Sequence, residues 1–172
     1  MTTEKLHFKT SSGIKSIVGK DLITDKFVAI FELVKNSYDA GAKQVTITFD
    51  KDKIIIVDDG HGMSKNDLVE KWLNLAYSEK KEGSLSNKER IYVGSKGIGR
   101  FSADRLGSKL TITTKVKDEN LQHIVWIDWN KFDEDLKTLF EDVYLDYEES
   151  RLFDLNVESY TKIEICSLHD KW

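Results

Sequence analysis

A short apolar run that ends in a carboxylate and two glycines constrains this chain more than any other feature. Residues 54–57 predict a strand that is buried on both faces, and residues 58–63, Asp-Asp-Gly-His-Gly-Met, follow at once. A rigid strand end holds a carboxylate in place, and glycines let the backbone approach a flat ring closely. Asp58 can therefore accept a hydrogen bond from an exocyclic amine such as that of adenine, with the methionine as a soft apolar contact. A plain Asp-Gly turn is the alternative interpretation.

A second polar cluster lies on a predicted helix that begins near Asp25 and is closed by Gly41. Glu32, Asn36 and Asp39 are spaced i, i+4 and i+7, which places them on one narrow face. An amide oxygen can bind Mg²⁺, and a carboxylate can polarise water for attack on a phosphate. The alternative is an ordinary solvent-facing polar stripe. It would lie opposite an apolar stripe that faces the core and consists of Phe27, Ile30, Phe31, Val34 and Tyr38.

A third cluster is the glycine-rich stretch 94–99, which precedes a predicted helix ending near Gly107. Glycines before a helix expose backbone N–H groups to anions, and Lys96 adds a positive charge for phosphate. The stretch lacks the Lys-Ser/Thr ending of a P-loop and does not follow a βαβ unit, so neither that fold nor a dinucleotide fold fits. Residues 78–87 before it are polar and predict a mobile loop.

The order of the remaining elements predicts the fold class. Further strands are expected at 45–49, 110–116, 121–129 and 160–165, and a second helix is expected to begin at Ser64 with a capping box to Asp67. The acidic segment 130–159 predicts helix and loop. We expect an α+β, two-layer α/β sandwich, with one mixed or antiparallel sheet and helices on one face, in a single domain over 1–172.

Composition excludes several classes of function. The 26 basic and 30 acidic residues give a net charge of −4, which does not favour nucleic-acid or membrane binding. The single cysteine, Cys166, excludes an internal disulfide and a cysteine-based zinc site. No stretch approaches transmembrane length, so we expect a cytoplasmic protein. The chain stops where a new element begins, which suggests the N-terminal part of a longer protein.

The three clusters, in this order, resemble the GHKL family of ATPases, named for gyrase, a heat-shock chaperone, histidine kinases and MutL. The first motif of the family matches Glu32, Asn36 and the pair Asp39-Ala40, and the second matches residues 58–63. The third matches residues 94–99, and a late strand contains Thr161 where the family carries a threonine. The motif sequences are most similar to those of the chaperone, MutL and Morc-like branches. They also resemble large prokaryotic ATP-binding proteins, some of which are linked to phage defence.

The resemblance implies a Bergerat fold and a role for each motif residue. Glu32 would be the catalytic general base, Asn36 would bind Mg²⁺, and Asp58 would hold the adenine amine. Residues 78–95 would form a lid over ATP. The implied ATP-binding set is Asn36, Asp39, Ala40, Asp58, Gly60, Gly62, Met63, Lys96, Gly97, Ile98, Gly99, Phe101 and Thr161.

Three hypotheses follow from this resemblance. The first is a Mg²⁺-dependent ATPase, slow in isolation, in which ATP drives homodimerisation and switches the downstream domains of a larger protein. Nucleic acid would be bound only through the full-length protein, and no membrane is involved. The second is a nucleotide sensor that does not hydrolyse ATP. The third is histidine-kinase-type phosphotransfer.

Overall fold

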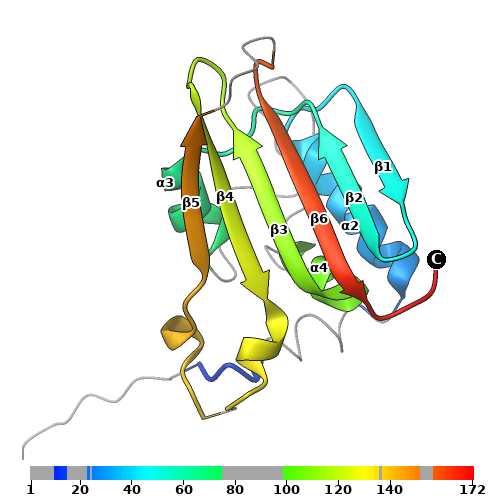
Figure 1. The fold of residues 1–172 in the computed structure, drawn as a ribbon, viewed down its shortest axis with the longest axis vertical. Helices are drawn as coiled ribbons and strands as arrows, with labels where there is room; N and C mark the ends of the chain where they lie inside the picture. Colours follow the sequence, from blue (N-terminus) through cyan, green and yellow to red (C-terminus); the bar gives the residue numbers. More distant parts are fainter. Residues whose placement is uncertain (1–9, 15–22, 24, 75–98, 136, 152–156) are drawn as a thin grey trace, which may run out of the picture.

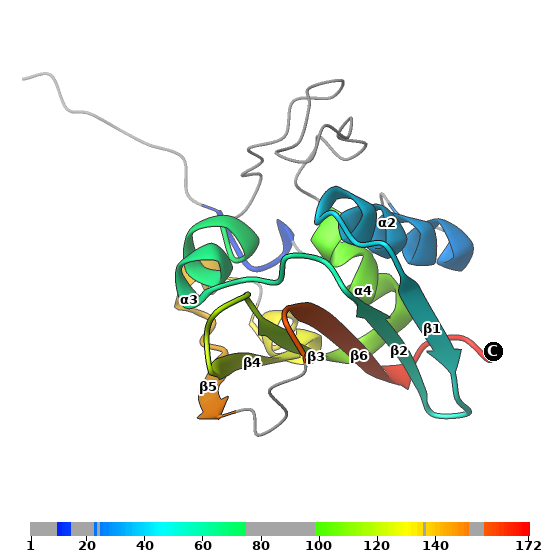
Figure 2. The ribbon, with the colours of Figure 1, turned by 90° about the horizontal axis from the view of Figure 1, so that it is seen from above.

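The backbone forms one open antiparallel sheet with helices on one of its faces (Figures 1 and 2). The computed structural model describes residues 10–14, 23, 25–74, 99–135, 137–151 and 157–172. In these residues the strand order is β1-β2-β6-β3-β4-β5, and every neighbouring pair is antiparallel. The strands are β1 (Val45–Phe49), β2 (Lys53–Asp58), β3 (Gly107–Lys115), β4 (Leu121–Asp128), β5 (Asp146–Arg151) and β6 (Tyr160–Leu168). The expected α+β architecture is thus confirmed, with an antiparallel sheet.

The last strand of the chain occupies the middle of the sheet. β6 lies between β2 and β3, and it separates the β1–β2 hairpin from the β3–β4 hairpin (Figure 1). In this register Thr161 of β6 is opposite Asp58 on one side and Thr114 on the other. Directly opposite residues of antiparallel strands point to the same face. The topology therefore brings together three polar side chains that are far apart in the sequence.

Helix α2 (Lys26–Asp39) begins and ends where the sequence indicates. The Asp25 side chain caps its first turn by accepting hydrogen bonds from the N–H groups of Phe27 and Val28, at 2.7 and 3.1 Å. Gly41 follows the helix with a φ of 74°, the left-handed conformation typical of a residue just beyond a helix end. The helix lies over the β1 and β2 side of the sheet (Figure 2).

The orientation of α2 differs from the expectation. Its buried face carries Ala29, Leu33 and Ser37, whereas Phe27 and Phe31 of the apolar stripe are 65% and 62% exposed. The apolar stripe therefore faces the core only in part, because Phe27, Phe31 and Tyr38 are exposed whereas Ile30 packs against the core. Small side chains let the helix approach its neighbours closely, and this turns the polar residues of the first cluster toward the body of the protein.

The other helices are short. The capping box at Ser64 is confirmed, because its hydroxyl accepts from the Asp67 N–H and the Asp67 carboxylate accepts from the Ser64 N–H. The helix that it starts changes to a π-helical turn and ends at Trp72. After Gly99, a 3₁₀ turn leads into a helix that stops at Gly107, as expected. These short elements are α3 (Lys65–Asp67), η2 (Leu68–Trp72), η3 (Gly99–Phe101), α4 (Ser102–Leu106), η4 (Trp129–Phe132) and η5 (Phe140–Asp142).

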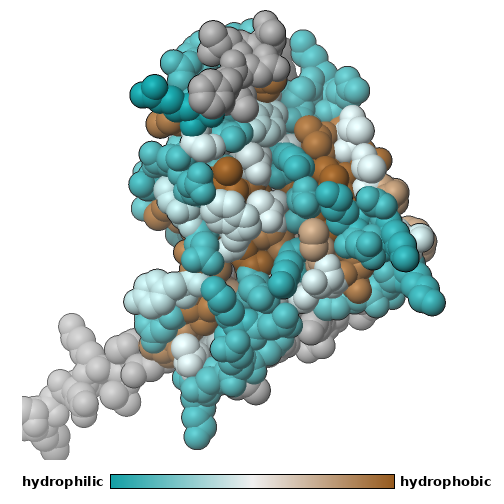
Figure 3. Space-filling view, in the orientation of Figure 1, coloured by the Kyte–Doolittle hydropathy of each residue, from teal (hydrophilic) through white to brown (hydrophobic). Residues whose placement is uncertain are grey.

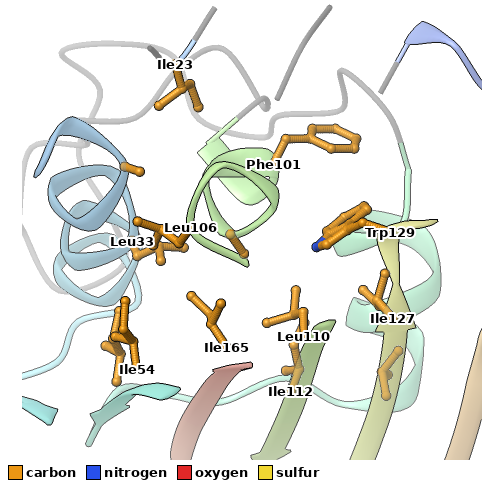
Figure 4. Close-up of a cluster of buried hydrophobic side chains, with 14 of the residues drawn as sticks. Ile23, Leu33, Ile54, Phe101, Leu106, Leu110, Ile112, Ile127, Trp129 and Ile165 are labelled. Atoms are coloured by element: carbon orange, nitrogen blue, oxygen red, sulfur yellow. The ribbon is translucent and has the colours of Figure 1, made fainter. Parts of the chain in front are cut away.

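The hydrophobic core fills the space between the helices and one face of the sheet (Figure 4). The helices supply Leu33, Leu106 and Phe101, and η4 supplies Trp129, all 3% exposed or less. The side chains that the strands supply to the core are Ile54, Ile56, Leu110, Ile112, Val125, Ile127 and Ile165.

The opposite face of the sheet is not covered by helices in the described structure. In β2 only alternate residues are buried, and Ile55 and Val57 stay partly exposed, so the expectation of a strand buried on both faces is wrong. Hydrophilic and apolar areas are mixed on this outer face (Figure 3). Glu164 forms ion pairs there with Lys162 and Lys53.

The acidic segment after β4 also differs from the expectation. Residues 130–159 were expected to form helix and loop, but they contain the edge strand β5, which pairs with β4 over Asp146–Arg151. Its side chains are mostly exposed. Because an edge strand packs little side-chain surface, its sequence shows little apolar alternation.

Candidate nucleotide site

Gly99, the last residue of the third cluster, lies beside the first cluster in the structure. Gly99 lies against the middle of α2, where a β-carbon on this glycine would be 3.4 Å from Glu32 Oε2. The same β-carbon would be 3.7 Å from Asn36 Nδ2 and 3.8 Å from its Oδ1. The end of the glycine-rich stretch therefore lies within contact distance of the Glu and Asn side chains.

Glu32 is held by an ion pair on its own helix. Lys35 Nζ lies 2.8 Å from Glu32 Oε1, and the Glu32 side chain is 28% exposed. The carboxylate thus has one oxygen engaged with Lys35 while the other, Oε2, is directed toward Gly99. A carboxylate in this position can accept a further hydrogen bond from water.

Asp58 is buried at the end of β2, with two donors fixed on its two oxygens. The Ser37 hydroxyl donates to Oδ2 at 2.7 Å, and the Gly60 N–H donates to Oδ1 at 2.9 Å. Burial raises the pKa of Asp58 above its usual value, and the hydrogen bonds from Ser37 and Gly60 oppose this rise. A carboxylate oxygen has two acceptor positions, so both oxygens retain capacity for a ligand.

The loop after Asp58 is attached to the end of α2. Asp59 Oδ1 accepts from the N–H groups of Lys43 and Gln44, at 2.7 and 2.8 Å. The hydrogen bond from Gln44, with help from that of Lys43, lowers the pKa of Asp59. The His61 N–H donates to the carbonyl of Ala40 at 3.0 Å. The helix end and the loop are therefore one rigid unit.

Gly60 and Gly62 are packed too closely for a side chain. A β-carbon on Gly60 would lie 3.0 Å from that of Ala40. Gly62 has a φ of 68°, and a β-carbon there would lie 1.9 Å from the Lys115 carbonyl oxygen. The Ser159 hydroxyl donates to the Gly60 carbonyl at 2.7 Å. Both glycines therefore hold the loop against β3 and the start of β6.

Met63 and Thr161 are joined through Thr114. The Thr114 hydroxyl accepts from the Met63 N–H at 2.9 Å and lies 3.2 Å from the Thr161 hydroxyl. It also donates to the Tyr160 carbonyl at 2.9 Å. Thr161 is 8% exposed and Thr114 is fully buried.

The structure brings most of the expected residues together. Asp39 is buried at the end of α2, beside the Ala40 contact to the loop. Phe101 is 3% exposed and packs in the core against Trp129 and Phe140. Lys96, Gly97, Ile98 and the expected lid at 78–95 lie outside the described residues.

Four polar residues of the site were missed by sequence reasoning. Ser37 could have been noticed from the sequence, because it follows Asn36 within a predicted helix and serine is not favoured in the interior of a helix. Thr114, Lys115 and Ser159 have no such signal, since their partners lie far away in the sequence: Thr114 and Ser159 bond to the loop itself, and Lys115 bonds to the segment before β6. Lys115 Nζ donates to the carbonyls of residues 157 and 158, at 3.0 and 2.8 Å, and so fixes the strand end beneath Gly62.

A divalent cation would need more than protein ligands here. In the described ranges, no three acidic, histidine or cysteine side chains gather as a metal site. The Asn36 amide oxygen is a suitable ligand for Mg²⁺, which favours one or two protein ligands completed by phosphate oxygens and water. The donor set therefore fits a cation that arrives with a nucleotide.

The fold and these motifs define a class of ATP-binding domain, and comparisons with known proteins agree. The sequence profile of the family described as "Histidine kinase-, DNA gyrase B-, and HSP90-like ATPase" matches residues 24–160. The chain belongs to this family, which is the GHKL family expected from the motifs.

Chaperone proteins are among the curated proteins that this chain is similar to. The chaperone protein HtpG of Rickettsia massiliae is 30% identical over 150 residues, which cover 72% of this chain and 24% of that protein. The mitochondrial TNF receptor-associated protein 1 homologue of Dictyostelium discoideum is 30% identical over 151 residues. That match covers 72% of this chain and 21% of the relative. The chain thus spans about a quarter of the length of these relatives.

A solved structure supports the fold alone. The crystal structure of the N-terminal domain of a DNA repair protein superposes with a TM-score of 0.55 at 20% identity, covering 90% of this chain and 39% of that one. In the described part of the chain, no helix combines the length and apolar character that crossing a membrane would require.

Proposed function

We propose that this domain binds ATP with Mg²⁺ and hydrolyses it slowly, with Asp58 recognising the adenine amine. The observation that carries the proposal is the pair of fixed donors on a buried carboxylate. Ser37 and Gly60 each donate to one Asp58 oxygen and so hold both oxygens as acceptors. An acceptor fixed in this way suits an exocyclic amine and repels a carbonyl oxygen.

The phosphate end of the nucleotide would lie toward Glu32 and Asn36. Asn36 would bind Mg²⁺ through its amide oxygen, and Glu32 would orient water for attack on the γ-phosphate. Support comes from the position of Gly99, the end of the glycine-rich stretch, where an added β-carbon would be in van der Waals contact with both side chains. Lys96 and its neighbours would supply the phosphate contacts, as the family resemblance implies.

Titration calorimetry with ATP and Mg²⁺ tests binding, and phosphate release tests hydrolysis. We expect Glu32→Gln to bind ATP as the wild type does and to lose turnover. Turnover that survives in Glu32→Gln would contradict the role of Glu32 as the base. Absence of ATP binding by the wild-type chain would overturn the proposal itself.

One observation favours the second hypothesis, a sensor that does not hydrolyse ATP. The Lys35 ion pair engages Glu32 and competes with a water for the same carboxylate. Lys35→Met distinguishes the two functions, because it removes the competing cation and leaves the carboxylate in place. A slow ATPase would release phosphate already in the wild type. A sensor kept inactive by the Lys35 ion pair would release none in the wild type and would gain phosphate release in Lys35→Met.

We also propose that ATP drives dimerisation and so switches a larger protein. The support is the family resemblance together with the length of the relatives, of which this chain spans about a quarter. Light scattering with and without a non-hydrolysable ATP analogue tests it. A mass that stays monomeric at saturating nucleotide would contradict dimerisation by this domain.

A further inference from the structure

We infer that Thr114 is a positioning residue that makes the Thr161 hydroxyl a hydrogen-bond acceptor, and so favours a 6-amino purine over a 6-oxo purine. This inference rests on the proposed function, because it concerns the base pocket of the same site. It follows from counting the protons and lone pairs of two buried hydroxyl groups.

The first step is the saturation of Thr114. A threonine hydroxyl has one proton and two acceptor positions. Its proton is used on the Tyr160 carbonyl, since two oxygens 2.9 Å apart need a hydrogen between them and a carbonyl has none. One acceptor position is occupied by the Met63 N–H, at 2.9 Å. Thr114 therefore has only one acceptor position left and no proton to give.

The second step fixes the direction of the bond between the two threonines. Their hydroxyl oxygens lie 3.2 Å apart, and either could donate on geometry alone. Because Thr114 has no proton available, Thr161 must donate to Thr114. The only proton of Thr161 is then used on Thr114, and the group offers a ligand its lone pairs alone.

The third step places these lone pairs next to Asp58. Thr161 is the register partner of Asp58 across β2 and β6, and side chains of such pairs are neighbours on one face. Asp58 is also an acceptor, with donors from Ser37 and Gly60 already in place. Two adjacent acceptors match the two hydrogens of an exocyclic amine, and they repel the carbonyl oxygen found at position 6 of hypoxanthine or guanine.

The decisive experiment compares ADP with IDP, which differ only at this end of the base and cannot lose a γ-phosphate. Calorimetric affinities are measured for the wild type, Thr114→Val and Thr114→Ser. Wild type and Thr114→Ser should favour ADP. In Thr114→Val the freed Thr161 proton can turn toward a carbonyl oxygen, so the ADP:IDP affinity ratio should fall by about tenfold, the effect of one hydrogen bond.

The ratio separates positioning from a general loss of structure. A purely structural role for Thr114 would weaken both nucleotides equally and leave the ratio unchanged, and that result would overturn the inference. In a Thr161→Val background, the Thr114→Val change should no longer move the ratio. If it still does, Thr114 does not act through Thr161.

Thr161→Val alone decides the direction of the bond if Thr114→Val does not fold. A Thr161 acceptor predicts weaker ADP binding with IDP unaffected or improved. A Thr161 donor predicts the reverse, which would contradict the inference. If the wild type binds neither nucleotide, the proposed function fails and this inference fails with it. If it binds both and only the ratio test fails, ATP binding stands and the role of Thr114 does not.

Discussion

The hydrogen bond from Ser37 to Asp58 allows a quantitative test of how the buried carboxylate is held. Ser37 is 3% exposed, and its hydroxyl lies 2.7 Å from Asp58 Oδ2. A hydrogen bond to a charged group contributes about 1.5–3 kcal/mol, against about 0.5–1.5 kcal/mol when both partners are neutral. Ser37→Ala should therefore lower the free energy of unfolding by about 2 kcal/mol near neutral pH.

Ser102→Ala is the matched control for this substitution. Ser102 is also a fully buried helical serine, but its hydroxyl has no hydrogen-bond partner in the described structure. Removing a buried hydroxyl without a partner removes a desolvation cost, so this variant should be neutral or slightly more stable. Denaturant unfolding gives the free energy of unfolding of both variants, and the comparison holds when that free energy depends on denaturant concentration with the same slope in each.

The pH dependence of Ser37→Ala adds a second, independent check. The bond from Ser37 lowers the pKa of Asp58 against the larger effect of burial, so its loss should raise that pKa further. The cost of Ser37→Ala should therefore shrink as pH falls and Asp58 becomes neutral. A cost equal to that of Ser102→Ala near neutral pH, or one that is independent of pH, would refute this account of the carboxylate.

Three further predictions concern other parts of the structure. Gly62→Ala should lower the free energy of unfolding by about 3 kcal/mol or more, because it adds a clash with the Lys115 carbonyl to the strain of a positive φ. Gly41→Ala, with a φ of 74°, is the control and should lower it by only about 1–2 kcal/mol. Equal losses of stability in the two variants would contradict the clash. ATP affinity should fall as the pH drops through the raised pKa of Asp58, because the amine needs the carboxylate. Over the same range the native state takes up a proton that the unfolded chain does not bind, so the protein should gain stability. Calorimetry and unfolding followed from neutral pH down to the ordinary range of an aspartic acid would contradict this if neither quantity changed. Trp172→Ala should lower the unfolding free energy by about 1 kcal/mol, since this side chain stacks on Phe49 and makes an edge-on contact with Phe27, two partly exposed rings. An unchanged midpoint of denaturant unfolding would show that these contacts contribute nothing.

Local features of the sequence were the ones that sequence reasoning predicted well. The capping box at Ser64, the end of α2 at Gly41 and the hairpin β3–β4 each depend on neighbours a few residues apart. Asp58 could be identified as a candidate site residue because it directly follows an apolar strand in the sequence. Such features depend on backbone propensities that act within a few residues.

Features set by long-range topology were not predictable in the same way. The placement of β6 between β2 and β3 makes Thr114 a neighbour of Thr161, and no sequence spacing indicates this. The rotation of α2 was misjudged because its aromatic residues form a continuous stripe, whereas the folded helix buries the small side chains of Ala29 and Ser37 instead. Burying small residues costs hydrophobic area but lets Ser37 reach the carboxylate of Asp58.

The most direct test of the account is the ATP affinity of Asp58→Asn beside that of Asp59→Asn. Both variants lose one negative charge from adjacent positions. Asp59 Oδ1 only anchors the backbone of Lys43 and Gln44, and an asparagine oxygen can accept the same bonds. We predict that Asp59→Asn binds ATP as the wild type does, and that Asp58→Asn binds it about 10–100-fold more weakly. Equal affinities for the two variants would contradict the assignment of Asp58 as the residue that recognises adenine.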